Sequence, residues 1–502
     1  MLQAGTGRRL INPDLGMPGP GIRIYCDPIV HIESDLTATA LVLETTGRKL
    51  VLIGYDLAVV PSTLAREVRH TVARSVGTSP SHVLVNYSHT HASPALQGWG
   101  MIDDAWQAAA IERYQARLVQ AAEHAAVEAD RGRQPARLAA GWGEAPLGVY
   151  RRETGSNGRL ILGEVPDTAI DRSVGVIRVD DLQGRPIAVV FSHGCHPVIM
   201  GPRSQAASSD FPGAARKVVE EVLGGTALFL QACGGNINPR YGIGFEVDCR
   251  DVKDREGTVL AGAVIAAASS LWTDKRRGPQ TLLGEFGIAL WPWLSVEEGT
   301  APPLAALERT LVIPLSELPP LDVARRVRDH HVAELGSARA GRARRADVSV
   351  AGRWARWAEI LVEACSLGEG VLETPTGTFS ISGRKATFET PIQAIRVGAV
   401  AIVATSFEMF CETGLTIKTG SPFPHTEVVG YSNGSAGYLP RAEDYPAEGW
   451  SVEQRYAVPD LFPQSWLWPV ILHPEAERLV VQAALGVLNE LAGGGAPRHH
   501  HA

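Results

Sequence analysis

Residues 84–94 read Leu-Val-Asn-Tyr-Ser-His-Thr-His-Ala-Ser-Pro, so a short apolar run leads directly into two histidines that are separated by one residue. Such a run, followed by polar residues and a proline, is typical of a buried strand that ends in a loop. Side chains two positions apart on an extended chain face the same side, so His89 and His91 can point into one cavity. A metal or catalytic role and ordinary hydrogen-bonded histidines are both compatible with this pattern.

Similar apolar runs recur along the chain and alternate with longer amphipathic segments. Strands are predicted at 38–43, 50–55, 82–87, 174–179, 187–191, 227–231, 386–388, 392–397 and 400–404. Helices are predicted at 64–76, 104–129, 214–223, 323–335, 353–364 and 475–491. The alternation predicts an α/β fold in which mixed β-sheets are covered by helices.

The segment 333–353 is rich in Arg and Ala, and we predict that it is an exposed helical excursion or a linker. No Pro-, Gly- or Ser-rich linker divides the rest of the chain. We therefore expect a single domain over residues 1–492, followed by a flexible Gly- and His-containing tail at 493–502.

Composition excludes several classes of protein. The chain has 502 residues, of which 45% are hydrophobic and 20% charged, which excludes a disordered or collagen-like protein. The net charge of −7, without a long basic cluster, argues against a nucleic-acid partner. Residues 1–23 lack the apolar run of a signal peptide, and no apolar stretch reaches the length of a membrane span. We therefore expect a cytoplasmic protein without membrane insertion, and a homo-oligomer is compatible with the sequence.

Cysteine usage points away from disulfides. The six cysteines are scattered and form no Cys-x-x-Cys pair. Neither a disulfide framework nor a thiolate zinc cluster is therefore predicted.

Two further predicted strands also end in residues that bind metals. The run 187–191 is followed by Ser-His-Gly-Cys-His-Pro, which places His196 in a turn where the chain leaves the sheet. The run 400–407 is followed by Glu408, and Glu412 lies one helical turn further on, so that the two carboxylates are expected to open one helix. A turn histidine that caps backbone groups, and carboxylates that stabilise a helix N-terminus, are the alternatives to metal binding.

Ligands of α/β proteins collect at the carboxyl ends of strands, where these residues are expected to lie. Two neutral histidines and one carboxylate form an open zinc site that can activate a water molecule. The pattern therefore predicts a metal-dependent hydrolase whose metal site lies at the carboxyl ends of strands.

The stretch Tyr-Ser-His-Thr-His-Ala-Ser-Pro, residues 87–94, resembles the Thr-His-Thr-His-Ser-Gly-Pro signature of neutral (non-lysosomal) ceramidases. Four further segments resemble motifs of that family in the same order. They are His196-Pro197-Val198 with residues 208–213, residues 229–239, Phe407-Glu408, and residues 430–445. The resemblance extends over almost the whole chain.

The resemblance implies one zinc ion per chain, held by His89, His196, Glu408 and Tyr438. From the residues alone, Tyr438 would be interpreted as a half-buried aromatic side chain. The zinc ligands that the family suggests therefore include one that the spacing of the residues does not indicate.

The resemblance also implies an amidohydrolase that cleaves a carboxamide, either an N-acyl amide or a small or cyclic amide, through a metal-activated water. It places His91 beside the scissile amide and Arg151, or its neighbour Arg152, near the substrate. In this mechanism Arg151 helps to stabilise the oxyanion, and His91 gives a proton to the leaving amine.

Three other positions complete the predicted site. Tyr445 lies in Glu443-Asp444-Tyr445, which resembles the Glu-Glu-Tyr of the family, and we predict that it binds substrate. A further tyrosine follows in the family, whereas the next aromatic residue here is Trp450. We predict that Trp450 also binds substrate, since its indole can donate a hydrogen bond although it cannot act as an acid. Asp210 is expected either to orient a histidine ligand or to cap the helix predicted at 214–223.

Two other functions are alternatives: a ceramidase-like binding protein without catalysis, and a metal-dependent esterase or lactonase. Ceramidases are typically secreted or membrane-associated and carry a C-terminal immunoglobulin-like domain, for which this sequence has neither a signal peptide nor the length. We therefore expect a substrate that is smaller or more polar than ceramide.

Overall fold

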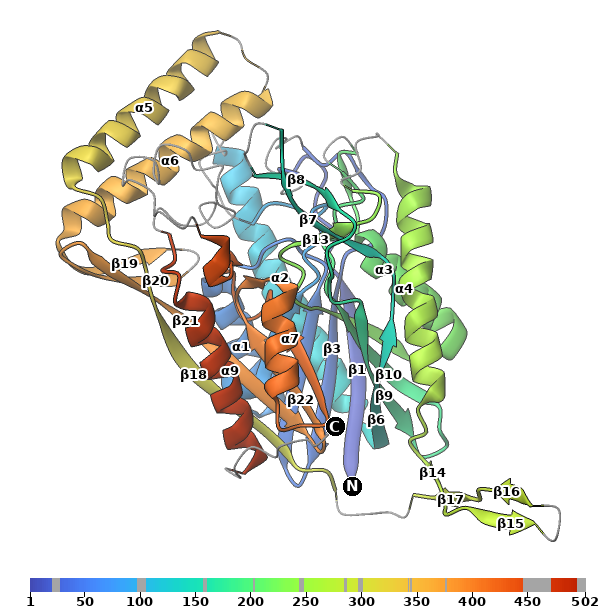
Figure 1. Cartoon of the computed structure of the whole chain (residues 1–502). Coiled ribbons are helices and arrows are strands. Elements are labelled where there is room, and N and C mark those ends of the chain that lie inside the picture. Colours follow the sequence, from blue (N-terminus) through green and yellow to red (C-terminus); the bar gives the residue numbers. More distant parts are fainter. Residues whose placement is uncertain are drawn as a thin grey trace.

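Two β-sheets face each other across an apolar interior, and helices cover their outer surfaces (Figure 1). The computed structural model describes residues 1–19, 28–96, 105–156, 160–201, 204–242, 248–283, 287–296, 301–341, 343, 345–374, 377–445 and 471–493. Within these residues the arrangement confirms the predicted α/β fold with mixed, helix-covered sheets.

The first sheet has eight strands in the order β12-β10-β9-β6-β1-β3-β4-β5. Strands β4 and β5, and strands β10 and β12, are parallel neighbours, whereas the other pairs are antiparallel. The strands are β1 Leu2–Leu10, β3 Thr37–Thr45, β4 Arg48–Tyr55, β5 Val83–Tyr87, β6 Gln134–Glu144, β9 Ser173–Asp181, β10 Pro186–His193 and β12 Thr226–Gln231.

The second sheet has six strands, in the order β19-β20-β21-β22-β24 with β18 also paired to β21. Its strands are β18 Leu304–Pro314, β19 Glu369–Thr374, β20 Gly377–Ser382, β21 Lys385–Val397, β22 Val400–Thr405 and β24 His425–Val429. Between the two sheets lies one apolar cluster, built from side chains such as Leu41, Leu52, Leu84, Val190, Leu228, Ile395 and Ile402. Strands β10 and β22 are buried on both faces, so their sequences are nearly continuous apolar runs instead of alternating patterns.

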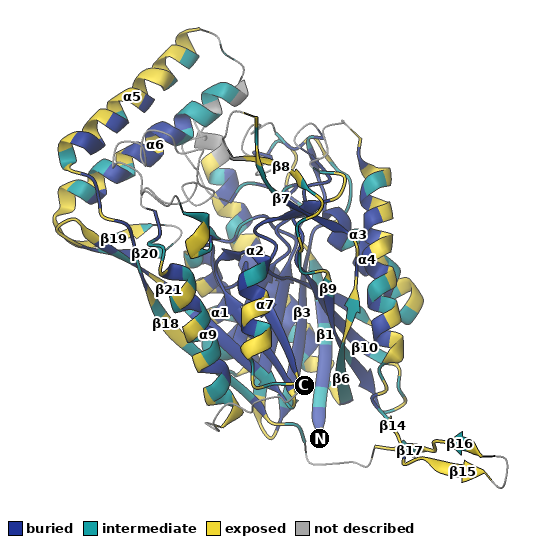
Figure 2. Ribbon diagram, viewed as in Figure 1, coloured by how far each residue is buried: buried dark blue, intermediate teal, exposed yellow. Residues whose placement is uncertain are grey.

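Each outer face of the sheets has its own helices. Helices α1 Ser62–Val76 and α2 Ala105–Arg131 cover β1, β3, β4 and β5, while α3 Asp210–Leu223 and α4 Arg250–Ser270 cover β6, β9 and β12. The second sheet is covered by α9 Ala476–Ala492, with α7 Cys411–Gly420 beside it. Figure 2 shows the buried sheets and the exposed outer faces of these helices.

The predicted excursion at 333–353 falls at the turn of a helical hairpin. Helices α5 Leu321–Ala340 and α6 Arg345–Leu367 pack against each other and extend from the sheets at the upper left of Figure 1. Their inner faces join the core through Trp354, Trp357 and Leu361. Among the described residues, no helix combines the length and apolar character that a membrane crossing requires.

Several elements have no counterpart among the predicted ones, among them helix α4 and strands β1, β6, β18, β20 and β24. Strand β1 contains Gly5 and Gly7, which weaken any strand pattern, yet both are required because a Cβ atom at either would lie 2.2 Å from a backbone oxygen of α2. The division into one domain and a tail stays a prediction; α9 ends at Ala492, and residues 494–502 lie outside the described residues.

Short polar links gather the carboxyl ends of several strands into one region. Asn86, near the end of β5, accepts a hydrogen bond from the backbone N–H of Gln231 at the end of β12 (2.8 Å) and donates one to the carbonyl of Gly430 after β24 (2.9 Å). Asn433 accepts a hydrogen bond from the backbone N–H of Val85 (3.0 Å). These buried amides fix the ends of strands from both sheets against each other.

We predict opposite effects for two glycines of helix α4. A Cβ atom at Gly257 would lie 2.5 Å from the Cβ of Ala214 on α3, whereas at Gly262, which is exposed, it would meet no atom within 4 Å. Gly257→Ala should lower the free energy of unfolding by about 1–3 kcal/mol through overpacking. Gly262→Ala should raise it by about 1 kcal/mol because alanine favours the helix. Thermal or urea unfolding measures both, and a Gly257→Ala protein as stable as Gly262→Ala would contradict the close packing of α3 on α4.

Candidate metal centre

Two histidines follow strand ends and turn one ring nitrogen inward. His89 lies two residues after β5 and His196 three residues after β10. The Nδ1 atoms of His89 and His196 lie 2.5 Å and 2.7 Å from the backbone carbonyls of Ala58 and Gly234. A carbonyl can only accept, so each Nδ1 carries the proton and each Nε2 of the neutral ring presents a lone pair. This is the arrangement in which histidines bind metal ions.

Glu408 reaches the same point from the second sheet. It lies in the short strand β23 Glu408–Met409, which pairs in parallel with β25 Tyr438–Leu439 so that Glu408 is opposite Tyr438. The expectation that Glu408 and Glu412 open one helix is wrong, because α7 begins only at Cys411. Glu412 lies in its first turn and bonds to Asn236 and Arg441. The dipole of α7 therefore accounts for Glu412, whereas Glu408 is a buried side chain of the site.

The separations between these side chains fit a tetrahedral metal ion. Glu408 Oε2 lies 3.3 Å from the Nε2 atoms of both His89 and His196. The Tyr438 hydroxyl lies 3.4 Å from His196 Nε2. A tetrahedral zinc ion with bonds of about 2.0–2.1 Å places its ligand atoms about 3.3–3.4 Å apart. The four residues that the family resemblance suggests as ligands thus present their polar atoms at spacings that suit one such ion.

The electrostatics of the cluster also favour a cation. Burial lowers the pKa of His196 to about 3, with the charge of Arg151 adding to the effect, so this ring is neutral near pH 7. Burial acts to raise the pKa of Glu408, but positive charge at His89 and His196 holds it well below its usual value, so a cation at this point keeps Glu408 ionised. Glu408 Oε2 is buried and receives no hydrogen bond within the described part of the chain. A carboxylate oxygen that faces two nitrogen lone pairs needs a positive ion between them.

His91 stands beside this cluster. Its Nε2 lies 3.1 Å from that of His89, and the two rings meet edge to face with centroids 4.6 Å apart. Its backbone N–H donates to the carbonyl of Pro197 (3.1 Å), which links this loop to the one that carries His196. His89, His91 and His196 each offer a ring nitrogen within 4.8 Å of the others. His91 is the least buried of the three histidines, although its Nδ1 atom is itself buried.

Arg151 and Arg152 occupy different surroundings on strand β7 Gly148–Thr154. The buried Arg151 donates from Nη2 to the Tyr438 hydroxyl (2.8 Å) and to the carbonyl of Gly235 (2.7 Å). These two hydrogen bonds fix the Tyr438 hydroxyl beside the cluster and leave its oxygen facing a positive charge. Arg152 instead pairs with Asp444 at 3.6 Å and lies over the Phe410 ring. Of the two, only Arg151 reaches the cluster directly.

Of the three remaining predicted residues, Asp210 and Tyr445 belong to the described part of the chain. Asp210 is buried and accepts hydrogen bonds from the backbone N–H groups of Met200 (2.9 Å) and Phe211 (2.6 Å), while burial raises its pKa to about 6. It does not orient a histidine ligand, because backbone carbonyls take that role, and helix α3 begins at Asp210 itself. Tyr445 directly follows the 3₁₀ turn Ala442–Asp444. Trp450 lies outside the described residues.

Sequence reasoning missed Tyr431, whose fully buried ring lies 4.6 Å from the ring of His89. Both residues have left-handed backbone angles, with φ of +64° at His89 and +52° at Tyr431. Such angles are costly for these residue types and concentrate at functional sites. The motif at 430–445 drew attention to this segment, but nothing in it distinguishes Tyr431 from an ordinary core aromatic.

Known structures share this fold, although sequence comparisons do not find them. No protein-family model matches the chain, and no curated protein matches it. The crystal structure of neutral ceramidase from Pseudomonas aeruginosa is similar over 100% of this chain and 76% of that chain, with a TM-score of 0.63 and 17% identity. A structure titled "Ceramidase complexed with C2" is similar over 100% of this chain and 77% of that chain, with a TM-score of 0.64 and 17% identity. The chain therefore has a ceramidase-like fold, which confirms the resemblance at the level of the fold.

We predict that Zn²⁺ stabilises the wild-type protein through Glu408. An ion that binds only the folded state raises the melting temperature, and the shift grows with the excess of the ion over its Kd. Glu408→Gln should remove most of the shift because the ion loses its charged ligand. Glu412→Gln is the matched control and should keep the shift, since Glu412 contacts Asn236 and Arg441 instead of the cluster. Equal shifts in the two variants, measured by thermal unfolding with and without Zn²⁺, would argue against this metal centre.

Proposed function

We propose that the protein is a zinc-dependent amidohydrolase that cleaves a carboxamide, either an N-acyl amide or a small or cyclic amide. One observation carries the proposal. Glu408 Oε2 lies 3.3 Å from the Nε2 atoms of both His89 and His196, and the Tyr438 hydroxyl lies 3.4 Å from His196 Nε2. A zinc ion held by these atoms supplies a water of lowered pKa and polarises the scissile carbonyl. The ceramidase-like fold supports an amide as the substrate.

The ligand atoms are held in place before any substrate binds. Backbone carbonyls of Ala58 and Gly234 fix the two histidine rings, and Arg151 fixes the Tyr438 hydroxyl. The guanidinium of Arg151 also bonds to Asn238 and to the carbonyl of Gly235, so it is rigid. This rigidity supports a role in which its charge stabilises the negative oxygen that forms on the carbonyl, partly through Tyr438.

His91 is placed to move the proton. The side chain is neutral because burial and the neighbouring histidines hold its pKa well below the usual value. Its Nδ1 has no hydrogen-bond partner within the described residues, and its Nε2 faces the cluster. It can therefore take a proton at the cluster and deliver it to the nitrogen of the leaving amine, which otherwise departs as an unstable anion.

We expect His91→Ala to retain one bound zinc per chain and to lose about 10²-fold or more in kcat/KM, as is typical when a general acid–base is removed. His70→Ala, which changes an exposed residue of helix α1, is the control and should behave as the wild type. The substrates are a panel of N-acyl amides, including a ceramide, and cyclic amides, each matched to an ester or a lactone. A chelator should abolish turnover of the amides, and added Zn²⁺ should restore it.

The same panel separates the alternatives. Turnover of esters or lactones alone would indicate the esterase or lactonase function, and binding without turnover would indicate a ceramidase-like binding protein. Amide turnover that neither the chelator nor His91→Ala reduces would overturn the proposed mechanism.

A further inference from the structure

The hydroxyl of Tyr431 is a buried polar group without a partner. The side chain is 0% exposed, and its hydroxyl makes no hydrogen bond within the described part of the chain. An unpaired buried hydroxyl costs about 1–3 kcal/mol, which a phenylalanine at this position would avoid. The cost is recovered if the hydroxyl bonds to a molecule that enters the site.

Tyr431 lies along the wall of the metal centre. Its ring packs against those of His89 and His196, with centroids 4.6 Å and 6.3 Å away. Its backbone N–H donates to the carbonyl of Phe407, the residue before Glu408. Tyr431 therefore borders the two histidines and the strand that would hold the ion.

A neighbouring tyrosine shows what an ordinary buried tyrosine does here. Tyr87 is also 0% exposed, and its ring meets that of Tyr431 edge to face with centroids 5.9 Å apart. Its hydroxyl donates to the carbonyl of Gly434 at 3.0 Å. The two tyrosines share one core but differ in whether the hydroxyl is satisfied.

We propose that the Tyr431 hydroxyl donates a hydrogen bond to the carbonyl oxygen of the substrate amide, and so helps to bind and polarise it. The proposal rests on the proposed function of this site. Glu408 and the two Nε2 atoms can only accept hydrogen bonds, so a donor on this wall complements them. A phenol remains protonated near pH 7, so this hydroxyl has a proton to donate.

Tyr431→Phe and Tyr87→Phe test the proposal as a matched pair. Tyr431→Phe should keep one zinc per chain and an equal or higher melting temperature, because it removes an unpaired hydroxyl. Its kcat/KM for the panel amides should fall about 10²-fold, the usual loss when one donor to a developing oxyanion is removed. Tyr87→Phe should lower the melting temperature, since it leaves the Gly434 carbonyl unpaired, while kcat/KM stays within about twofold of the wild type.

Binding of the panel amides, measured by calorimetry with and without zinc, distinguishes failure of this proposal from failure of the proposed function. If the wild type binds amides without turning them over, the proposed function fails, and about tenfold weaker binding by Tyr431→Phe would still support the hydrogen bond. A Tyr431→Phe protein that binds and hydrolyses amides as the wild type does would overturn the proposal. So would a wild type that binds no amide.

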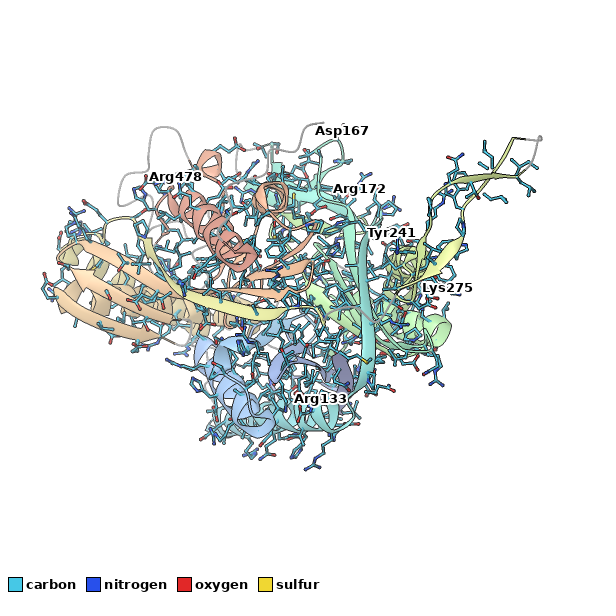
Figure 3. The ribbon with its side chains drawn as sticks, turned by 90° about the horizontal axis from the view of Figure 1, so that it is seen from below. Arg133, Asp167, Arg172, Tyr241, Lys275 and Arg478 are labelled. Carbon is cyan, nitrogen blue, oxygen red and sulfur yellow. The ribbon has the colours of Figure 1, made fainter. Side chains whose placement is uncertain are left out.

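A second inference rests on a different part of the molecule, the β-arm formed by residues 272–296. Strands β14 Lys275–Arg277 and β17 Trp293–Ser295 form its root, and β15 Thr281–Leu283 and β16 Ile288–Leu290 form its outer part. The arm extends away from both sheets at the lower right of Figure 1, and Figure 3 shows its side chains standing clear of the body, with Lys275 near the root. An isolated two-stranded ribbon is only marginally stable in water.

The arm concentrates exposed apolar side chains. Eight of the 23 large hydrophobic residues that are exposed in the described chain belong to it: Trp272, Leu282, Leu283, Ile288, Leu290, Trp291, Trp293 and Val296. Cross-strand partners Leu283 and Ile288 lie on one face and are 54% and 52% exposed. Apolar clusters of this kind mark interaction surfaces.

A complementary cavity lies at the root of the same arm. It has a volume of about 740 Å³ and is lined mainly by apolar residues, including Leu2, Trp142, Pro302 and Val400. Thr273 and Val296, which lie at the two ends of the arm, line it as well. Arm and cavity are thus adjacent patches of one surface, and a two-fold, isologous contact can let each arm reach the cavity of the other copy.

We infer that a second copy of this chain covers the arm, with the outer part of each arm seated at the cavity of its partner. Charge favours this arrangement over a pairing of the two arms with each other. Lys275, Arg276 and Arg277 are consecutive and exposed, so root-to-root pairing would bring six cations together. Strands β15 and β16 carry no charged residue and can enter an apolar cavity.

The oligomeric state of the full chain tests this inference. Light scattering coupled to gel filtration should give a dimer at tens of micromolar, and the double variant Leu283→Glu with Ile288→Glu should be a monomer with an unchanged melting transition of the body. Val259→Glu, on the exposed face of α4, is the matched control and should remain a dimer. A monomeric wild type would overturn the inference, and binding of that monomer to anionic vesicles would indicate a membrane surface as the partner of the arm. A dimer that the double variant leaves intact would also overturn it.

Discussion

The site depends on one constraint: several hydrogen-bond acceptor atoms face one another in the same small buried space. Glu408 Oε2 and the Nε2 atoms of His89 and His196 lie within 3.3 Å contacts, and the Nδ1 protons of both rings are already committed to backbone carbonyls. Such a cluster is unfavourable unless a positive ion occupies its centre. The left-handed backbone at His89 is a conformational cost of placing its ring in this cluster. The hydrogen bond from Arg151 holds the Tyr438 hydroxyl in the same arrangement.

The two-sheet architecture explains how residues more than 300 positions apart meet. His89 and His196 leave strands of the first sheet, whereas Glu408 and Tyr438 follow strands of the second. The buried amides of Asn86 and Asn433 join the strand ends across the sheets, so the spacing of the ligand atoms is set by the fold and does not depend on flexible loops. The amide-hydrolysing chemistry proposed for the site uses this rigidity, since orientation of the reacting groups is a large part of catalysis.

Sequence patterns predicted the parts of the site that follow buried strands. His89, His196 and Glu408 each come directly after an apolar run, and the carboxyl ends of such runs gather at one edge of a sheet. Only the family resemblance predicts Tyr438 and Arg151 as site residues. A tyrosine before Leu-Pro and an arginine in a polar strand have no sequence spacing that indicates a role in the site. Tyr431 carried no signal, since its importance arises from an unpaired hydroxyl that only coordinates can show. For Asp210 the sequence leaves two roles open, and the histidines are oriented by backbone carbonyls, which sequence patterns do not reveal.

Anomalous diffraction at the zinc edge, from crystals of the wild-type protein grown with Zn²⁺, shows whether an ion occupies this cluster. We expect one strong peak per chain, within about 2.0–2.2 Å of His89 Nε2, His196 Nε2 and Glu408 Oε2 and beside the Tyr438 hydroxyl. No peak at this point, or a peak only at the other histidine-rich group formed by His330, His331 and Glu334 on helix α5, would contradict it.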